Sequence, residues 1–236
     1  MSELILGIDD AGRGPVIGPM ALGGCLVEKE NEGKLKSLGV KDSKLLTVAK
    51  RENLVKEIHG IAEAHEIVVF TAKEINEMMN SGINLNFIEA IAAAQIINKI
   101  RIKFPSEEIK VVLDCPSTNK IAWLGKVKDL IGDLKGMSFI CEHKADRDYV
   151  VVGAASILAK VKRDDEVEKL KKEIGMDFGS GYPSDPATVD FVKKNYEKFK
   201  EREIFREHWA TLKNILGIDT KKNAMEDYRE KQKKLF

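Results

Sequence analysis

The stretch ELILGIDDAGRGPVIGP, from Glu3 to Pro19, decides which fold the sequence predicts. Its apolar run from Glu3 to Ile8 ends in two adjacent aspartates and a glycine-rich turn, which is the pattern of a short buried strand. The next run, Val16 to Val27, is rich in Val, Ile, Leu and Gly and predicts a second strand in which glycines favour bulges. A β-sheet is therefore expected at the N-terminus, with carboxylates at the end of its first strand.

Further along the chain, segments with strand character alternate with segments of helical periodicity. We expect strands over 66–71, 109–114 and 137–141, and helices over 47–65, 84–102 and 149–175, with Thr47 as an N-cap. The part after the turn GSGYPSDP is predicted to be helical to the end. The alternation predicts an α/β protein with a mixed β-sheet flanked by helices. We expect a main domain over 1–185 and a helical, basic C-terminal subdomain over 186–236 packed on it.

Composition narrows the class of protein. The chain is 43% hydrophobic and 33% charged, which is ordinary for a globular protein, and no apolar run is long enough for a membrane span. The N-terminus lacks the features of an export signal, so we expect a cytoplasmic protein. The cysteines Cys25, Cys115 and Cys141 have no CxxC spacing, which predicts free thiols and argues against a disulfide framework or a structural zinc site.

Charge is unevenly distributed although the net charge is only +1. From Phe191 to Phe236 the chain has 13 Lys or Arg and 8 Asp or Glu, so this region carries +5 and the first 190 residues carry −4. A basic C-terminal region on a mildly acidic body fits an acidic metal site with a phosphate-contacting arm, and it fits a plain solvated helical face equally well.

Carboxylates stand at the ends of several predicted strands. Asp9 and Asp114 each close a buried run, and ligands in α/β sheets bind outside the carboxyl ends of strands. Asp146 precedes the helix expected from Tyr149, so it is either a further ligand or an N-cap residue, and Asp9 could be a turn residue. Clustered carboxylates repel one another unless a cation is present, and hard oxygen ligands select Mg²⁺ or Mn²⁺. Two such ions bound close together can catalyse the hydrolysis of a phosphodiester.

The adjacent pair Asp9 and Asp10 raises a geometric question. Consecutive residues of a strand point to opposite faces, so both side chains cannot ordinarily enter one site. The difficulty disappears if the strand stops at Asp9 and the chain turns into the loop at Ala11 and Gly12. It is also reduced if Asp10 contributes through its backbone carbonyl.

The loop Gly12-Arg13-Gly14 has a cation between two glycines. It is neither a P-loop nor the dinucleotide fingerprint GxGxxG. Flanking glycines let the backbone approach a ligand closely and expose N–H and C=O groups to a sugar or phosphate. The alternative is a β-turn whose arginine lies on the surface.

Several segments together resemble type 2 ribonuclease H (ribonuclease HII) in its archaeal form. They are GIDDAGRGPVIGPM, VKDSKLL, VLDCPST, HKADRDYVVVGAASILAKVKRD and GSGYPSDPAT, spread in order from Gly7 to Thr188, and the dipeptide at His208 and Trp209 is similar too. The resemblance implies an RNase H-like mixed sheet flanked by helices with a helical C-terminal subdomain. It implies an endonuclease that hydrolyses the RNA strand of RNA–DNA hybrids and incises 5′ of ribonucleotides in duplex DNA.

The same resemblance implies the roles of particular residues. The metal-binding and catalytic carboxylates would be Asp9, Asp10, Asp114 and Asp146, with two Mg²⁺ or Mn²⁺ ions. Gly12, Arg13 and Gly14 would sense the ribose 2′-OH, the group that distinguishes RNA from DNA. The remaining substrate-binding residues would be Tyr182, stacked against a deoxyribose, and the phosphate-path residues Asp42, Ser43, Lys44, Lys160 and Arg163. Lys160 and Arg163 share one helix face, and a solvated face is their alternative.

This chain departs from the family at Asp10, where the family pattern GIDEAGRG has Glu. The loss of one methylene retracts the carboxylate by about 1.5 Å. We therefore expect reduced activity, and a catalytically weak nucleic-acid-binding module stays an alternative. A Holliday-junction resolvase shares the carboxylate arrangement but not the motifs after it, and an actin-like or sugar-kinase ATPase would need a second, duplicated half.

Expected partners are nucleic acid and a replication sliding clamp, with no membrane, and the chain is expected to be a monomer.

Overall fold

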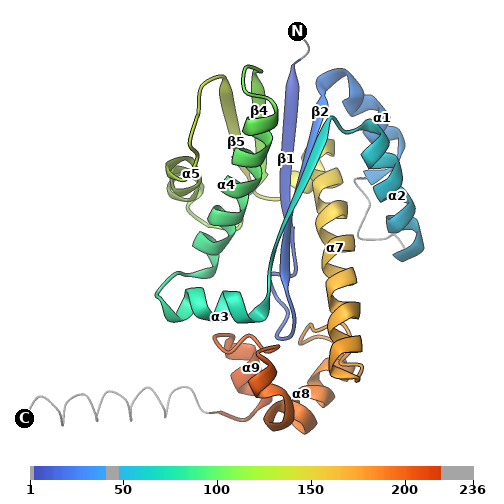
Figure 1. Cartoon of the computed structure of the whole chain (residues 1–236), viewed down its shortest axis with the longest axis vertical. Coiled ribbons are helices and arrows are strands. Elements are labelled where there is room, and N and C mark those ends of the chain that lie inside the picture. Colours follow the sequence, from blue (N-terminus) through green and yellow to red (C-terminus); the bar gives the residue numbers. More distant parts are fainter. Residues whose placement is uncertain (1–2, 41–47, 219–236) are drawn as a thin grey trace, which may run out of the picture.

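The structure is a computed structural model of the whole chain, and it describes residues 3–40 and 48–218. Figure 1 shows a twisted sheet between two layers of helices, with further helices at the lower end. The sheet has the order β3-β2-β1-β4-β5. Its strands are β1 (Leu4–Ala11), β2 (Met20–Glu28), β3 (Ala64–Phe70), β4 (Ile109–Asp114) and β5 (Met137–Glu142). β2 pairs antiparallel with β1 and β3, whereas β1, β4 and β5 are parallel, so the predicted mixed sheet is confirmed.

Helices cover both faces of the sheet because its central strands are apolar on both sides. Leu6 and Ile8 of β1 pack into the core beneath α4, while Ile5 packs on the opposite side against α7. The first layer contains α3 (Ala72–Asn80), α4 (Leu85–Lys103) and α5 (Lys120–Asp129). The second contains α1 (Glu32–Ser37), α2 (Val48–Ile61), the short α6 (Ala145–Asp148) and the long α7 (Val150–Ile174). None of the described helices is long and apolar enough to span a membrane.

Two glycines allow α7 to lie directly on the sheet. A Cβ atom added to Gly7 of β1 would be 2.4 Å from the backbone of Val151, and one added to Gly23 of β2 would be 2.5 Å from the carbonyl oxygen of Ala155. Both distances are far below ordinary van der Waals contact, so no larger residue fits without moving the helix. These glycines therefore determine where the side chains of α7 stand relative to the end of β1.

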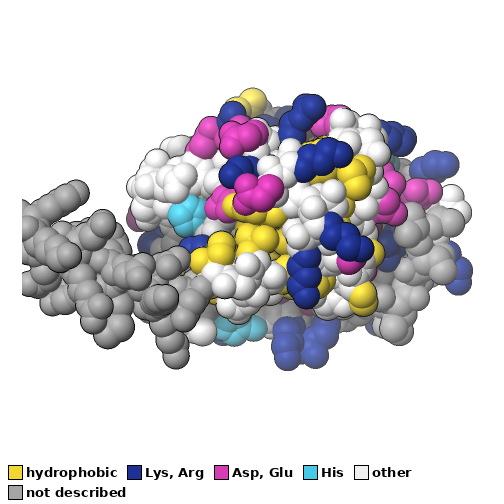
Figure 2. Space-filling view, turned by 90° about the horizontal axis from the view of Figure 1, so that it is seen from below, with side chains coloured by type: hydrophobic (Ala, Val, Ile, Leu, Met, Phe, Trp, Pro, Cys, Tyr) yellow, Lys and Arg dark blue, Asp and Glu magenta, His cyan; other side chains and the backbone are white. Residues whose placement is uncertain are grey.

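The C-terminal elements join the body through a third apolar cluster. They are α8 (Pro186–Phe199), the 3-10 helix η3 (Lys200–Arg202) and α9 (Ala210–Ile215). Phe191 of α8 and Phe205, between η3 and α9, are buried and pack with Val16 and Ile17 of the β1–β2 connection and with Val167 of α7. Figure 2 views this end from below and shows Lys and Arg side chains spread over it with Asp and Glu between them.

Several expected elements have different ends from those predicted. The helix expected over 47–65 ends at Ile61, and His65 lies in β3 because the chain pairs with β2 from Ala64 onwards. The Thr47 cap lies outside the described residues. The strand expected from Val16 begins only at Met20, since Val16 and Ile17 leave the sheet and bind Gly181 and the 204–206 segment. Helices α3 and α5 were not predicted, whereas the helix expected from 149 to 175 agrees closely with α7.

Candidate active site

The adjacent aspartates lie within β1 and not beyond its end. The strand continues to Ala11, and Asp9 and Asp10 pair with Gly23 and Leu22 of β2. The possibility that the strand stops at Asp9 is therefore wrong. Because strand residues alternate, Asp9 points to the α7 side, where the Ser156 hydroxyl hydrogen-bonds it, and Asp10 points to the α4 side toward Glu89.

The two aspartates still reach one hollow because it lies at the edge of the sheet. β4 pairs with β1 only as far as Ile8 and ends at Asp114, which leaves the end of β1 uncovered on that side. The hollow is lined by Asp9, Asp10, Asp114 and Glu89, with Ile8, Leu22, Pro116 and Trp123 as its apolar part. The backbone N–H of Ala145 donates to Asp114 Oδ1 over 2.7 Å and fixes that side chain. The predicted meeting of carboxylates from separate strands is present for Asp9, Asp10 and Asp114.

Negative charge is concentrated in this hollow. Burial, followed by the charge of Asp10, raises the pKa of Asp9, which the Ser156 hydrogen bond opposes. Burial and the charge of Glu89 raise the pKa of Asp10, and Arg13 opposes the shift. Burial also raises the pKa of Glu89. A hard divalent cation would relieve this repulsion, so the donor set fits Mg²⁺ or Mn²⁺. Within residues 3–40 and 48–218, no three His, Cys, Asp or Glu side chains are already gathered closely enough to hold a metal ion.

Asp146 lies close to the hollow without lining it. It is in the first turn of α6, next to Ala145, whose N–H binds Asp114. The N-cap of α7 is Tyr149, so Asp146 does not cap that helix. Its main-chain oxygen would be 3.2 Å from a Cβ atom at Gly153, which shows how tightly α6 packs on α7. Asp146 is thus the residue that follows the one whose N–H binds Asp114, but it does not line the hollow with the other three carboxylates.

The loop Gly12-Arg13-Gly14, here called the GRG loop, is held in a conformation that glycine favours. Gly12 has φ +87° and its Cβ would be 2.8 Å from the carbonyl oxygen of Pro19. Gly14 is exposed and its Cβ would be 3.8 Å from the Tyr182 ring. The loop and Tyr182 therefore lie side by side, as expected for two parts of one binding surface.

Arg13 is not a free surface cation. It forms an ion pair with Glu89 of α4, whose side chain is 1% exposed, and its Nη2 donates to Asn86 Oδ1 over 2.6 Å. Sequence reasoning missed both partners. The available signal was an acidic residue within the apolar helix expected over 84–102, because a buried carboxylate needs a partner.

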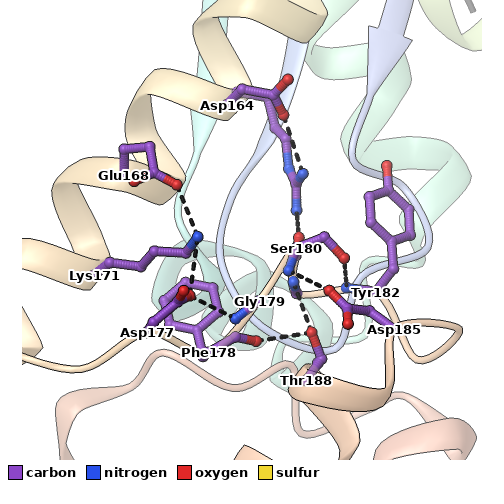
Figure 3. A network of polar contacts seen from close by, with 12 residues as sticks. Asp164, Glu168, Lys171, Asp177, Phe178, Gly179, Ser180, Tyr182, Asp185 and Thr188 are labelled. Atoms are coloured by element: carbon purple, nitrogen blue, oxygen red, sulfur yellow. Dashed lines mark hydrogen bonds and ion pairs between the residues drawn. The ribbon is translucent and has the colours of Figure 1, made fainter. Parts of the chain in front are cut away.

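Tyr182 belongs to a turn stabilised by its own polar network, shown in Figure 3. Asp185 accepts from the N–H of Ser180 over 2.7 Å, and the buried Thr188 hydroxyl donates to the Phe178 carbonyl over 2.8 Å and accepts from the Gly181 N–H over 3.0 Å. In the figure the Tyr182 ring points away from these contacts. The network thus presents the ring on a fixed base.

The remaining predicted residues have different surroundings. Lys160 is partly exposed, and its Nζ donates to Ser156 Oγ over 2.8 Å, which connects it to Asp9. Arg163 is buried, donates to the carbonyl oxygen of Ser180 over 2.5 Å and has its guanidinium 4.8 Å from the centre of the Tyr182 ring. The predicted phosphate-path residues Asp42, Ser43 and Lys44 lie outside the described residues.

Comparisons with known proteins show which family this chain resembles. The family model described as Ribonuclease HII matches residues 6–212. A curated relative named Ribonuclease HII from Methanocaldococcus jannaschii is 45% identical over 90% of this chain and 95% of its own length. The crystal structure of ribonuclease H2 from Pyrococcus horikoshii OT3 has a TM-score of 0.78 at 37% identity, covering 91% of this chain and 97% of that one. The structure of the PCNA:RNase HII complex from Archaeoglobus fulgidus has a TM-score of 0.75 at 34% identity, and the match covers 89% of this chain and 95% of that one.

Proposed function

Because this chain belongs to the ribonuclease HII family, whose members are endonucleases of the RNase H class, we propose that it hydrolyses the RNA strand of RNA–DNA hybrids and incises 5′ of ribonucleotides in duplex DNA. The observation that carries this proposal is the position of the GRG loop. It follows directly after the strand that bears Asp9 and Asp10, so a ribose read by the loop brings its phosphate to the carboxylate hollow.

The carboxylates are proposed to bind the metal ions that the reaction needs. Asp9, Asp10, Asp114 and Asp146 are the residues proposed to hold two divalent ions, and ribonucleases HII depend on such ions. The chemistry that bound Mg²⁺ or Mn²⁺ supplies is activation of a water molecule and stabilisation of charge on the departing 3′ oxygen. Ser156 and Lys160 fix Asp9 from the α7 side, while the Ala145 N–H fixes Asp114. The expected products have a 3′-hydroxyl and a 5′-phosphate.

Recognition is proposed to use the surface beside the hollow. Backbone groups of Gly12, Arg13 and Gly14 contact the ribose 2′-OH, and Tyr182 stacks against the next deoxyribose. Arg163 supports Tyr182, since its guanidinium lies against that ring and donates a hydrogen bond to the carbonyl oxygen of Ser180. In this scheme the 2′-OH is recognised and does not act as the nucleophile.

The test uses a DNA duplex with one ribonucleotide, incubated with Mg²⁺ or Mn²⁺. We expect incision 5′ of the ribonucleotide, with no cleavage of an all-DNA duplex and none by Asp114→Asn. A 2′,3′-cyclic phosphate product would contradict the mechanism. Cleavage of a four-way DNA junction in place of the ribonucleotide duplex would favour a resolvase, and binding without cleavage would favour the non-catalytic alternative.

Assembly is a separate part of the proposal. We assign residues 1–185 to the catalytic domain and 186–236 to a helical subdomain packed on it, in a monomeric protein. The relative from Archaeoglobus fulgidus was solved in a complex with PCNA, which supports a sliding clamp as a partner of this chain. Gel filtration of the chain alone and with a sliding clamp tests both points: a dimer on its own, or no co-elution, would contradict them.

A further inference from the structure

Arg206 is a buried cation that the proposed reaction does not use. It lies between η3 and α9, its side chain is 0% exposed, and its Nη2 has no hydrogen-bond partner. Burial, followed by repulsion from Arg163, lowers the pKa of Arg206 to about 9, so the guanidinium is still charged at neutral pH. A buried charge destabilises the folded state unless its surroundings compensate, so its position requires an explanation.

The side-chain hydrogen bonds of Arg206 go to the central residue of the GRG loop and to Gly18, near the end of the connection that follows the loop. Nη1 donates to the carbonyl oxygen of Arg13 over 3.2 Å, and Nε donates to the carbonyl oxygen of Gly18 over 2.9 Å. The guanidinium lies 5.0 Å from the centre of the Trp209 ring, and the backbone N–H of Arg206 donates to the carbonyl oxygen of Val16 over 2.9 Å. The charge is compensated by backbone dipoles of the loop and by an aromatic face.

Arg13 is consequently held at two points, its side chain and its backbone carbonyl. Its side chain is tied to Glu89 and Asn86 of α4, and its carbonyl is tied to Arg206. The peptide between Arg13 and Gly14 is planar and trans, so the N–H of Gly14 points away from the carbonyl that Arg206 binds. This orientation directs a backbone donor away from the protein interior, on the residue that lies beside Tyr182.

We propose that Arg206 is the positioning residue of the GRG loop, so that the C-terminal segment takes part in distinguishing ribonucleotides from deoxyribonucleotides. The inference rests on the proposed function, since it assumes that the GRG loop reads the 2′-OH. Arg206 acts through the loop and does not touch the substrate. Lysine at this position would keep the charge but could not hold two carbonyls in the fork geometry of a guanidinium.

The experiment compares the binding of two duplexes that differ in one hydroxyl group. The dissociation constants for a DNA duplex with one ribonucleotide and for the same all-DNA duplex are measured in EDTA, which prevents cleavage, and their ratio reports discrimination. For Arg206→Lys we expect this ratio to fall about tenfold, the effect of losing a hydrogen bond to a charged group, with little change for the all-DNA duplex.

The matched control is Arg101→Lys. Arg101 is also buried, and its Nη1 donates to the carbonyl oxygens of Phe104 and Glu107, each over 3.0 Å, in the connection between α4 and β4. Its substitution should lower the melting temperature without changing the ratio. If Arg206→Lys does not fold, Trp209→Leu removes the ring against the guanidinium while leaving both donors, and a smaller fall of the ratio is expected.

The possible results separate this inference from the proposed function. A wild-type protein that binds both duplexes equally contradicts ribonucleotide recognition itself. A wild-type preference that survives in folded Arg206→Lys, or in Trp209→Leu where that variant replaces it, overturns the inference alone. Equal weakening of both duplexes also overturns it, because this is the signature of general destabilisation.

Discussion

Replacement of Gly7 by alanine tests whether the contact between α7 and the sheet controls the site. The added Cβ would be 2.4 Å from the carbonyl carbon of Val151, whereas ordinary contact begins at 3.4 Å. The helix must therefore move by about 1 Å, and overpacking of this kind destabilises proteins by about 1–3 kcal/mol. For a chain of this size each kcal/mol lowers the melting temperature by roughly 2–4 °C.

The same displacement should reduce the rate of cleavage. α7 carries Ser156, which binds Asp9, and Lys160, which binds Ser156. A misplacement of about 1 Å in such a group can lower the rate by ~100-fold. The assay is single-turnover cleavage of a duplex with one ribonucleotide, with thermal unfolding of the same samples.

A surface glycine provides the control for the Gly7 prediction. Gly60 in α2 has no atom within 4 Å of its added Cβ, so Gly60→Ala should be neutral or stabilise the helix by about 0.5–1 kcal/mol. If Gly7→Ala has the melting temperature and the rate of the wild type, the argument from helix placement is refuted.

Three further predictions concern the carboxylates and the Tyr182 turn. Asp10→Glu should raise the cleavage rate, by up to ~100-fold if the shorter side chain misplaces the carboxylate by about 1 Å, and an equal or lower rate would contradict this. Asp10 has its pKa raised to about 7 in the folded protein, so the metal-free protein should lose stability as pH rises from about 4 through 7. Asp10→Asn in EDTA should accordingly raise the melting temperature at pH 8 and not at pH 4, and the same increase at both pH values would refute the argument. Thr188→Val should destabilise the protein by about 1–3 kcal/mol in chemical unfolding, because Gly181 N–H and Phe178 C=O lose their buried partner, whereas Thr188→Ser should retain most of the stability.

Most of the fold could be predicted because it depends on local patterns. The run from Ile109 to Asp114 and the apolar helix beginning after Asn84 both agree with the structure. The missed helix α3 had a local signal as well, since Thr71 and Glu74 form a capping box at its start. The end of α2 at Ile61 had none, because it is determined by the pairing of β3 with β2.

The candidate site, too, could be predicted only in part from the sequence. Asp9 and Asp114 could be placed because strand ends meet at the carboxyl edge of a sheet. The continuation of β1 through Asp10 depends on its neighbour β2, which pairs beyond the point where β4 stops. Glu89 carried a local signal as an acidic residue in an apolar helix, but its partner Arg13 is distant in sequence, and Arg206 carried no signal of this kind.

The contact between Arg206 and Gly18 also has a consequence for the order in which the protein matures. The two residues are 188 positions apart, so during synthesis on the ribosome the GRG loop emerges long before its partner exists. A nascent chain can form β1 and bury its apolar side chains early, but its loop lacks the guanidinium that fixes it. If Arg206 positions the GRG loop as proposed, the loop would become able to read a ribonucleotide only after residue 206 has been synthesised.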